Sequence, residues 1–113
     1  MDFARVPVGL QSALSEKFGG AGDPEFLLSE ISLAGDSETL TISMHVSVAW
    51  GSGGKEKWAL RVDLSGSDTD AARPGAAVEA YRWLALMVQT NVIEWWHTRR
   101  TAPNIPETPR RIG

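Results

Sequence analysis

The chain contains no cysteine among its 113 residues. This absence excludes a disulfide framework, a thiolate zinc site and a cysteine nucleophile. Histidine is scarce as well, because only His45 and His97 are present, so few imidazole ligands are available for a metal. The glycine-rich segment at 51–54 is followed by a strand-like pattern and not by the helix of a phosphate-binding loop. We therefore expect neither a bound metal nor a cofactor.

Long apolar runs are also missing. No segment approaches the roughly 20 consecutive apolar residues that a membrane-spanning helix needs. The first residues, MDFARVPVGL, lack the basic start and the apolar segment of a signal peptide. We expect a cytoplasmic protein with no membrane partner.

The chain has no excess of basic residues, since its formal net charge is −3. A charge of this sign opposes the approach of nucleic acid. The segment WWHTRR at 95–100 combines aromatic and basic side chains, as surfaces that bind single strands do, but the overall acidity weighs against that function. We expect no nucleic-acid partner, whereas a protein of basic character would be attracted.

The chain is instead rich in alternating patterns. Residues 39–50, TLTISMHVSVAW, place an apolar side chain at every even position and a polar or small one at every odd position. Alternation of this length is typical of an antiparallel strand with one face on the core and the other in solvent. Residues 25–34 and 56–64 have shorter strand patterns, and the segments 35–38 and 51–54 have the composition of turns. These short turns predict a three-stranded meander in sequence order.

Helical patterns flank the three predicted strands. Residues 6–18 carry apolar side chains at three- and four-residue steps, and the glycines at 19–20 then end the helix. After a linker at 65–75, a longer helix is predicted from Ala76 to Arg99. The expected fold class is therefore α+β, in the order helix, three strands, helix, with the long helix packed across one face of the sheet.

This division predicts one domain at residues 1–101 and an extended, proline-containing tail at 102–113. The order of elements is shared with double-stranded-RNA-binding domains, but topology alone carries no function. Those domains begin their second helix with lysines that meet phosphates. Residues 68–80 here read DTDAARPGAAVEA and contain no lysine, so RNA binding is not expected.

The predicted long helix has one apolar stripe that is suited to the core. Its members fall in one sector of a helical wheel: Tyr81, Leu84, Ala85, Val88, Val92 and Trp95. We expect this stripe to lie on the apolar faces of the strands, at Leu40, Ile42, Val46, Leu60 and Val62. Burial of each large side chain contributes roughly 1.5–3 kcal/mol. A role in the core is therefore enough to explain these residues.

A second apolar row runs along the opposite side of the same helix. It has the 3-4-3-4 spacing of a helix-packing seam and consists of Trp83, Leu86, Thr90, Ile93 and His97, with Arg100 beside it. Three elements could pack on this row and bury it: the N-terminal helix, the same helix in a second copy of the chain, or a different protein. Tryptophan and arginine are favoured anchors of protein interfaces, so we include this row among the expected partner-binding residues.

The solvent face of the predicted sheet is the other candidate surface. Thr41, Ser43, His45 and Arg61 should lie on it together, with His45 near Arg61 or Asp63 and near Leu28 of the first strand. A hydrolase centred on His45 would need a nucleophile within hydrogen-bond reach and an oxyanion hole. Serines on a flat strand suggest neither, and such residues are common on any solvent-facing strand. We expect a docking surface or an ordinary wet face.

The residues at the end of the predicted long helix point in different directions and are expected to have different roles. Trp95 belongs to the core stripe, Trp96 lies at its edge, and the arginines at 99–100 oppose the negative end of the helix dipole. The prolines of the tail, at 103, 106 and 109, would align along one edge of a polyproline II helix. The tail has three open interpretations: disorder, packing over the tryptophans of this chain, or a ligand for an SH3-type groove.

The sequence therefore predicts a non-catalytic protein-binding module, such as an inhibitor, an immunity protein, an adaptor or a small chaperone. The alternative is a homo-oligomeric structural protein, with a homodimer formed through the second row. The third possibility is an enzyme, a small hydrolase centred on His45. The small size, the acidity and the number of tryptophans, five in all, favour the binding module.

Overall fold

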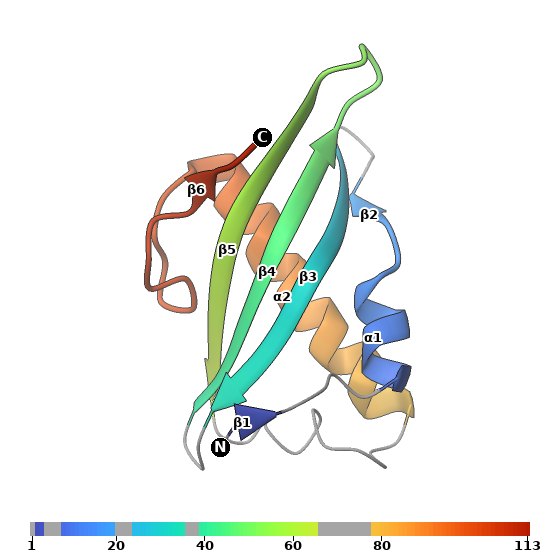
Figure 1. Ribbon diagram of the computed structural model, residues 1–113, viewed down its shortest axis with the longest axis vertical. Helices are drawn as coiled ribbons and strands as arrows, with labels where there is room; N and C mark the ends of the chain where they lie inside the picture. The colour runs from blue at the N-terminus through green and yellow to red at the C-terminus, as the bar shows by residue number, and fades with distance from the viewer. Residues whose placement is uncertain (1, 4–7, 20–23, 36–38, 66–77) are drawn as a thin grey trace.

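The computed structural model describes residues 2–3, 8–19, 24–35, 39–65 and 78–113. It has an antiparallel sheet with a long C-terminal helix packed across one face, which confirms the predicted α+β class (Figure 1). The elements are β1 (Asp2–Phe3), α1 (Val8–Leu14), β2 (Phe18–Gly19), β3 (Glu25–Gly35), β4 (Thr39–Ala49), β5 (Lys55–Ser65), α2 (Val78–Thr98) and β6 (Arg110–Arg111). The predicted turn at 36–38, the linker at 66–77 and the first residues of both predicted helices lie outside the described residues.

The three long strands β3, β4 and β5 pair in sequence order, as the meander requires. The strand count of three was too low, because β1 and β2 add to the outer side of β3 and β6 adds to the outer side of β5. Each added strand is two residues long. A pattern of period two cannot be recognised in two residues, so these strands are set by tertiary contacts rather than by local sequence.

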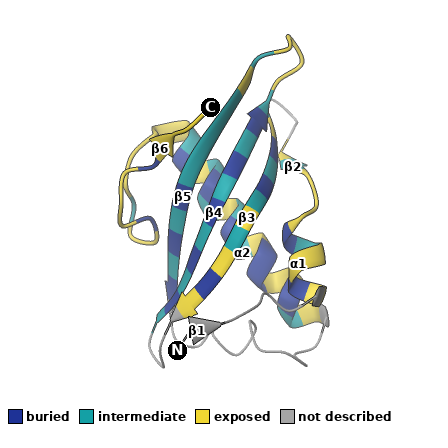
Figure 2. Ribbon diagram, in the orientation of Figure 1, coloured by how far each residue is buried: buried dark blue, intermediate teal, exposed yellow. Residues whose placement is uncertain are grey.

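The core lies between the sheet and α2, and the predicted core residues are all found in it. The six stripe residues of α2 are each at most 6% exposed, and the five apolar residues expected on β4 and β5 are at most 4% exposed. Figure 2 shows buried and half-buried residues alternating along β4. Trp50 departs from this pattern, because β4 ends at Ala49 and the indole of Trp50 lies 37% exposed beside Trp96, with ring centroids 5.9 Å apart.

The N-terminal helix is shorter than predicted. α1 ends at Leu14, and Phe18 lies in β2, where it pairs with Phe26 and stacks on its ring at a centroid distance of 5.3 Å. Gly19 has a φ of 97°, and a Cβ at this position would clash with the carbonyl oxygen of Pro24. The helical spacing of Phe18 was therefore misleading, because its aromatic contact and the backbone conformation of Gly19 favour a strand at the edge of the sheet.

A β-bulge interrupts the pairing of β3 with β4. Ser29 pairs with His45 and Ser32 pairs with Ser43, so two residues of β3 lie opposite one residue of β4. Glu30, the first of the two, has a φ of 49°, a left-handed conformation that is usually taken by glycine in such a bulge. The bulge and the exposed carboxylate of Glu30 lie on β3 between its short partners β1 and β2, where they discourage pairing with a foreign strand.

We expect Glu30→Gly to stabilise the protein. A left-handed conformation costs a side-chain-bearing residue about 1–2 kcal/mol, and glycine avoids this cost while losing some chain entropy. A net gain of about 0.5–1 kcal/mol in the free energy of unfolding should appear in urea denaturation. The matched control is Ser32→Gly in the same strand, which has no such strain and should lose about 0.5–1 kcal/mol. Equal losses in both variants would contradict this account.

The tail at 102–113 is ordered and folds back along β5 (Figure 1). Ala102 and Ile105 form an isolated bridge, and Asn104 accepts a hydrogen bond of 2.8 Å from the backbone N–H of Asp63. Ile105 is 1% exposed and belongs to the core. The tail therefore contacts the sheet through both its backbone and the side chain of Ile105. The division into a domain at residues 1–101 and a separate tail at 102–113 stays a prediction.

The prolines of the tail do not share one edge. Pro109 is buried, whereas Pro103 and Pro106 are exposed. Beyond Pro109, β6 lies against β5, and the backbone N–H of Ile112 donates to the carbonyl of Lys57 at 2.7 Å. The edge of β5 is therefore covered by the chain itself, which protects it from pairing with other molecules.

Candidate functional site

The structure places the predicted partner-binding residues on two surfaces at opposite sides of the molecule. One surface is the outer side of α2, away from the sheet, together with Arg100 just beyond the end of the helix. We call this surface the outer row: Trp83, Leu86, Thr90, Ile93, His97 and Arg100. The other is the face of the sheet that α2 does not cover, which we call the open face and which includes Thr41, Ser43, His45 and Arg61 (Figure 1).

The outer row contains the most exposed large apolar side chains of the described residues. Trp83 is 62% exposed and Leu86 is 52% exposed. Ile93 is half-buried against the core, and Thr90, His97 and Arg100 are exposed. A tryptophan and a leucine one helical turn apart in solvent form an apolar patch of the kind that marks an interaction surface.

The N-terminal helix does not cover the outer row. α1 packs beside α2 so closely that a Cβ on Gly9 would lie 2.7 Å from the ring of Tyr81. A hollow of about 580 Å³ lies between the two helices, and Leu86 borders it. Trp83 and Leu86 nevertheless remain exposed. The expectation of an intramolecular cover is therefore wrong for the described part of α1, because this helix lies at the side of α2 rather than on its outer surface.

A second hollow extends the outer row at the C-terminal end of α2. It has a volume of about 470 Å³ and is bordered by Ile93 and His97 of α2, by Arg100 just after the helix, and by Ala102 and Pro103 of the tail. The tail residues were not predicted as part of this surface. No local signal could have placed them there, because their position depends on the turn that returns the chain to β5.

The middle of the outer row behaves as an apolar surface. The hydroxyl of Thr90 donates a hydrogen bond of 2.8 Å to the carbonyl oxygen of Leu86, one turn earlier in the helix. The hydroxyl donor is thereby satisfied within α2, so a partner would meet the methyl group without leaving a donor unpaired.

The structure of the last turn of α2 accounts for the aromatic and basic side chains of the WWHTRR segment. Arg99 has a φ of 56°, and its backbone N–H donates to the carbonyl of Trp95, which is the hydrogen bond of a left-handed helix cap. Its guanidinium lies 3.4 Å from the ring centroid of Trp96, and its Nε donates to the carbonyl of Trp96 at 2.7 Å. A cation over an aromatic face is attracted to it, which offsets the strain of the cap. Arg99 is therefore structural, and Arg100 belongs to the surface.

On the open face, His45 has smaller neighbours than predicted. It lies opposite Ser29 of β3 and Ala59 of β5, whereas the predicted neighbour Leu28 pairs with Val46 and is buried on the other face. Without the bulge, the register of Leu33 with Ile42 would have placed Glu30 opposite His45. His45 borders a hollow of about 380 Å³ together with Arg61, Ser43 and the bulge residue Glu30.

Arg61 is paired with two carboxylates on the open face. Its guanidinium makes two hydrogen bonds to the carboxylate of Asp63, at 3.0 and 2.9 Å, and one of 3.2 Å to Glu107 of the tail. The hydrogen bond to Asp63 raises the pKa of Arg61 most, burial acts against it, and the charges of Asp63 and Glu107 raise the pKa further. The Glu107 contact was missed in the sequence, because it joins residues 46 positions apart.

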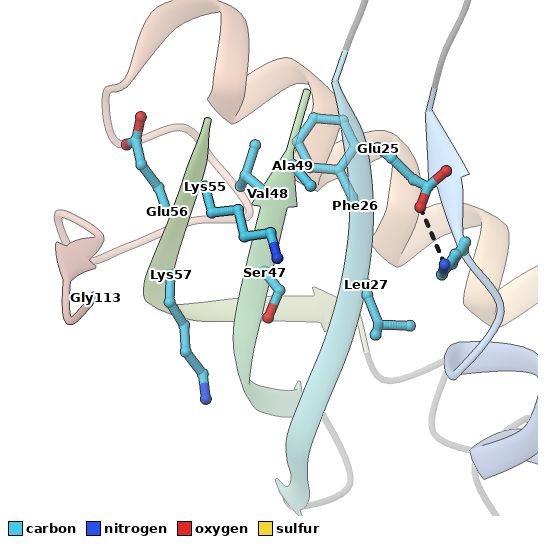
Figure 3. A pocket seen from close by; sticks show the side chains of 11 residues that line it. Glu25, Phe26, Leu27, Ser47, Val48, Ala49, Lys55, Glu56, Lys57 and Gly113 are labelled. Carbon is cyan, nitrogen blue, oxygen red and sulfur yellow. Dashed lines mark ion pairs between the residues drawn. The ribbon is translucent and has the colours of Figure 1, made fainter. Parts of the chain in front are cut away.

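A further hollow of about 430 Å³ occupies the end of the open face nearest the 51–54 turn (Figure 3). Ser47 of β4 and Lys57 of β5 lie opposite each other here, and Ala49 lies opposite Lys55. Lys17 makes an ion pair of 3.3 Å with Glu25 at its border. The lysines alternate along β5 with the same period as Arg61, so their place on this face could have been predicted from the sequence.

These groups do not form a catalytic relay. Asp63 is engaged with Arg61, and Nδ1 of His45 is buried without a hydrogen bond to any described residue. The serines around His45 stand on strands, without the tight turn that exposes a nucleophile. Over the described ranges, no group of three histidine, aspartate or glutamate side chains is arranged to hold a metal ion.

The described part of the chain contains no helix with the length and apolarity that crossing a membrane requires. Comparison with known protein families, with curated proteins and with solved structures gives no match to this chain. A functional proposal therefore depends on the two surfaces.

Proposed function

We propose that this chain is a non-catalytic protein-binding module and that the outer row of α2 is its binding surface. The observation that carries the proposal is the exposure of Trp83 and Leu86, at 62% and 52%, on a helix whose other side already holds the core. An inhibitor, an immunity protein, an adaptor or a small chaperone would each use such a surface.

The outer row has the composition of a binding site. Large aromatic and arginine side chains dominate the binding energy of protein interfaces, and Trp83 and Arg100 lie near opposite ends of the row. The hollow beside Ile93 and Pro103 offers a recess into which a partner side chain would fit. Arg82 and Gln89 border the row on the side of α1 and supply a polar rim.

The open face of the sheet is the second candidate surface. It carries charges of both signs, with Lys55 and Lys57 toward one end and Glu30, Asp63 and Glu107 toward the other. Its exposed large apolar side chain among the described residues is Ile112 beside Lys57, at 40% exposure, whereas the outer row carries Trp83 and Leu86 at 62% and 52%, so we rank the open face below the outer row. A hydrolase centred on His45 is the least supported candidate, because Asp63 is paired with Arg61.

The test is a double variant, Trp83→Ser with Ile93→Ser. We expect it to keep the circular dichroism spectrum of the wild type, since Trp83 lies outside the core and Ile93 only borders it. It should lose an association that the wild type makes, either with itself or with another protein, as measured by light scattering and by affinity capture. Ile112→Ser, which alters an exposed isoleucine in the tail, is the matched control. A double variant with the wild-type mass and the wild-type captured proteins would overturn the proposal.

A further inference from the structure

We infer that the occupant of the outer row is a second copy of this chain, bound antiparallel about a two-fold axis that passes close to Thr90. The inference rests on the proposed function and names the partner. The observations that carry it are the regular spacing of the row, the opposite charges of its two ends and the satisfied hydroxyl at its centre.

The spacing of the row is that of a helix seam extended over the whole of α2. Within α2, Glu79 and the outer-row residues up to His97 follow one another at steps of 4, 3, 4, 3 and 4 residues, and Arg100 lies just beyond the helix, where it borders the same hollow as Ile93 and His97. This is the heptad spacing that lets two helices pack side by side over their whole length. Because α2 is one continuous helix of 21 residues, or about 32 Å, one copy presents the seam from Glu79 to His97 without interruption.

The charges of the seam are self-complementary in the antiparallel orientation. The exposed carboxylate of Glu79 lies in the first turn of α2, and His97 and Arg100 lie at the other end. In an antiparallel pair, Glu79 of each copy faces the His97–Arg100 end of the other, and the helix dipoles oppose one another favourably. In a parallel pair, like charges and like dipole ends would face each other at both ends.

The apolar residues of the seam match in the same orientation. With the axis near Thr90, Trp83 of one copy lies level with His97 of the second copy, Leu86 lies level with Ile93, and the two Thr90 side chains meet at the axis. Since the Thr90 hydroxyl donates to Leu86 within its own helix, the two helices can approach there without an unpaired donor. A two-fold interface requires this kind of self-complementary patch.

The expected dimer is reversible. One helix pair of this length buries less than the roughly 1,200–2,000 Å² of a standard stable interface. The net charge of −3 on each copy also opposes association at long range, although physiological salt screens it beyond about 8 Å. The measurement therefore extends to about 1 mM chain, where even an interface of millimolar affinity is populated.

The first test is solution mass by light scattering over a dilution series. We expect a species of twice the 12.3 kDa chain mass at high concentration. Leu86→Lys should raise the dissociation constant at least about 100-fold, because each copy then buries a charge in place of an apolar side chain. Ile112→Lys, which places the same charge at an exposed isoleucine of the tail and off the seam, is the control and should leave the dissociation constant unchanged.

A charge reversal then tests the orientation. Glu79→Lys should raise the dissociation constant about 3- to 20-fold, since the two-fold axis repeats the repulsion at both ends. Adding Arg100→Glu to the same chain should restore most of the affinity, because each lysine again faces a carboxylate of the other copy. A foreign partner would not be restored by this second change. An unaltered dissociation constant in Glu79→Lys, or no restoration, would overturn the antiparallel arrangement.

Cross-linking gives an independent readout, because the chain has no cysteine of its own. A short bismaleimide should join two copies of Thr90→Cys, which lie close to the axis. It should not join two copies of Glu79→Cys, which are about 30 Å apart in the antiparallel pair. It should join Glu79→Cys to Arg100→Cys when the two variants are mixed. Efficient joining of Glu79→Cys to itself would show a parallel pair and overturn the inference.

The outcomes separate this inference from the proposed function. A wild type that stays monomeric at about 1 mM overturns the second copy as the occupant. If that monomer still captures another protein through Trp83 and Ile93, the proposed function stands. If it captures none, both proposals fail.

Discussion

Trp95→Ala is expected to lower the free energy of unfolding by about 3–5 kcal/mol, the usual loss for a large aromatic residue removed from a core. Trp95 is 1% exposed and packs edge-on against Trp58 and Trp96, at centroid distances of 5.1 and 6.0 Å. Such ring pairs contribute about 0.5–1.5 kcal/mol beyond the area they bury. Because a small domain has only about 5–15 kcal/mol of stability in total, this variant should unfold at a much lower urea concentration.

The matched control is Trp83→Ala on the opposite side of the same helix. Its side chain is 62% exposed, so the substitution should change the free energy of unfolding by no more than about 0.5 kcal/mol when the protein is monomeric. Urea denaturation of both variants at low concentration gives the comparison. Similar losses at the two positions would mean that α2 is oriented differently on the sheet.

Ile105→Ala should have the second-largest effect, a loss of about 2–5 kcal/mol. Ile105 is 1% exposed and lies in the turn that returns the tail to β5, where its backbone N–H donates to Ala102 at 2.9 Å. The substitution leaves a cavity under that turn. It should also loosen the tail, which hydrogen exchange at the Asp63 amide would report, since Asn104 accepts its hydrogen bond.

Ile112→Ala is the comparison for the tail, because this isoleucine is 40% exposed. We expect a change within about 0.5 kcal/mol. If Ile105→Ala were as mild as Ile112→Ala, the tail would be an appendage, as the division into residues 1–101 and 102–113 suggests. A large difference between the two would make the tail an integral part of the fold.

The two surfaces have different consequences for the molecule. If the outer row is taken by a second copy, the open face with His45 and Arg61 stays free on each copy for another protein. If a foreign protein takes the outer row, the open face has no evident role beyond solvation. The dilution series therefore also decides how the second surface should be studied.

The outer row shows which properties of a surface can be predicted from the sequence and which cannot. The spacing of Trp83, Leu86, Thr90 and Ile93 was visible in the sequence, because helical periodicity places residues on a face whatever the rest of the chain does. Its exposure was not visible, since that depended on where α1 packs. The same limit applies to His45, whose predicted neighbour Leu28 was wrong because Gly35 pairs with Leu40 at the turn and the bulge at Glu30 then places Ser29 opposite His45.

The local pattern was sufficient for the α+β class, the order of the long strands and the buried face of α2, because each depends on a period of two or 3.6 residues repeated over many positions. Tertiary contacts alone decided four features: the strand at Phe18, the left-handed bulge at Glu30, the return of the tail through Ile105 and the contact between Arg61 and Glu107. Each involves few residues or partners distant in sequence. The free energy that selects them comes from packing and pairing across the fold, which no short segment contains.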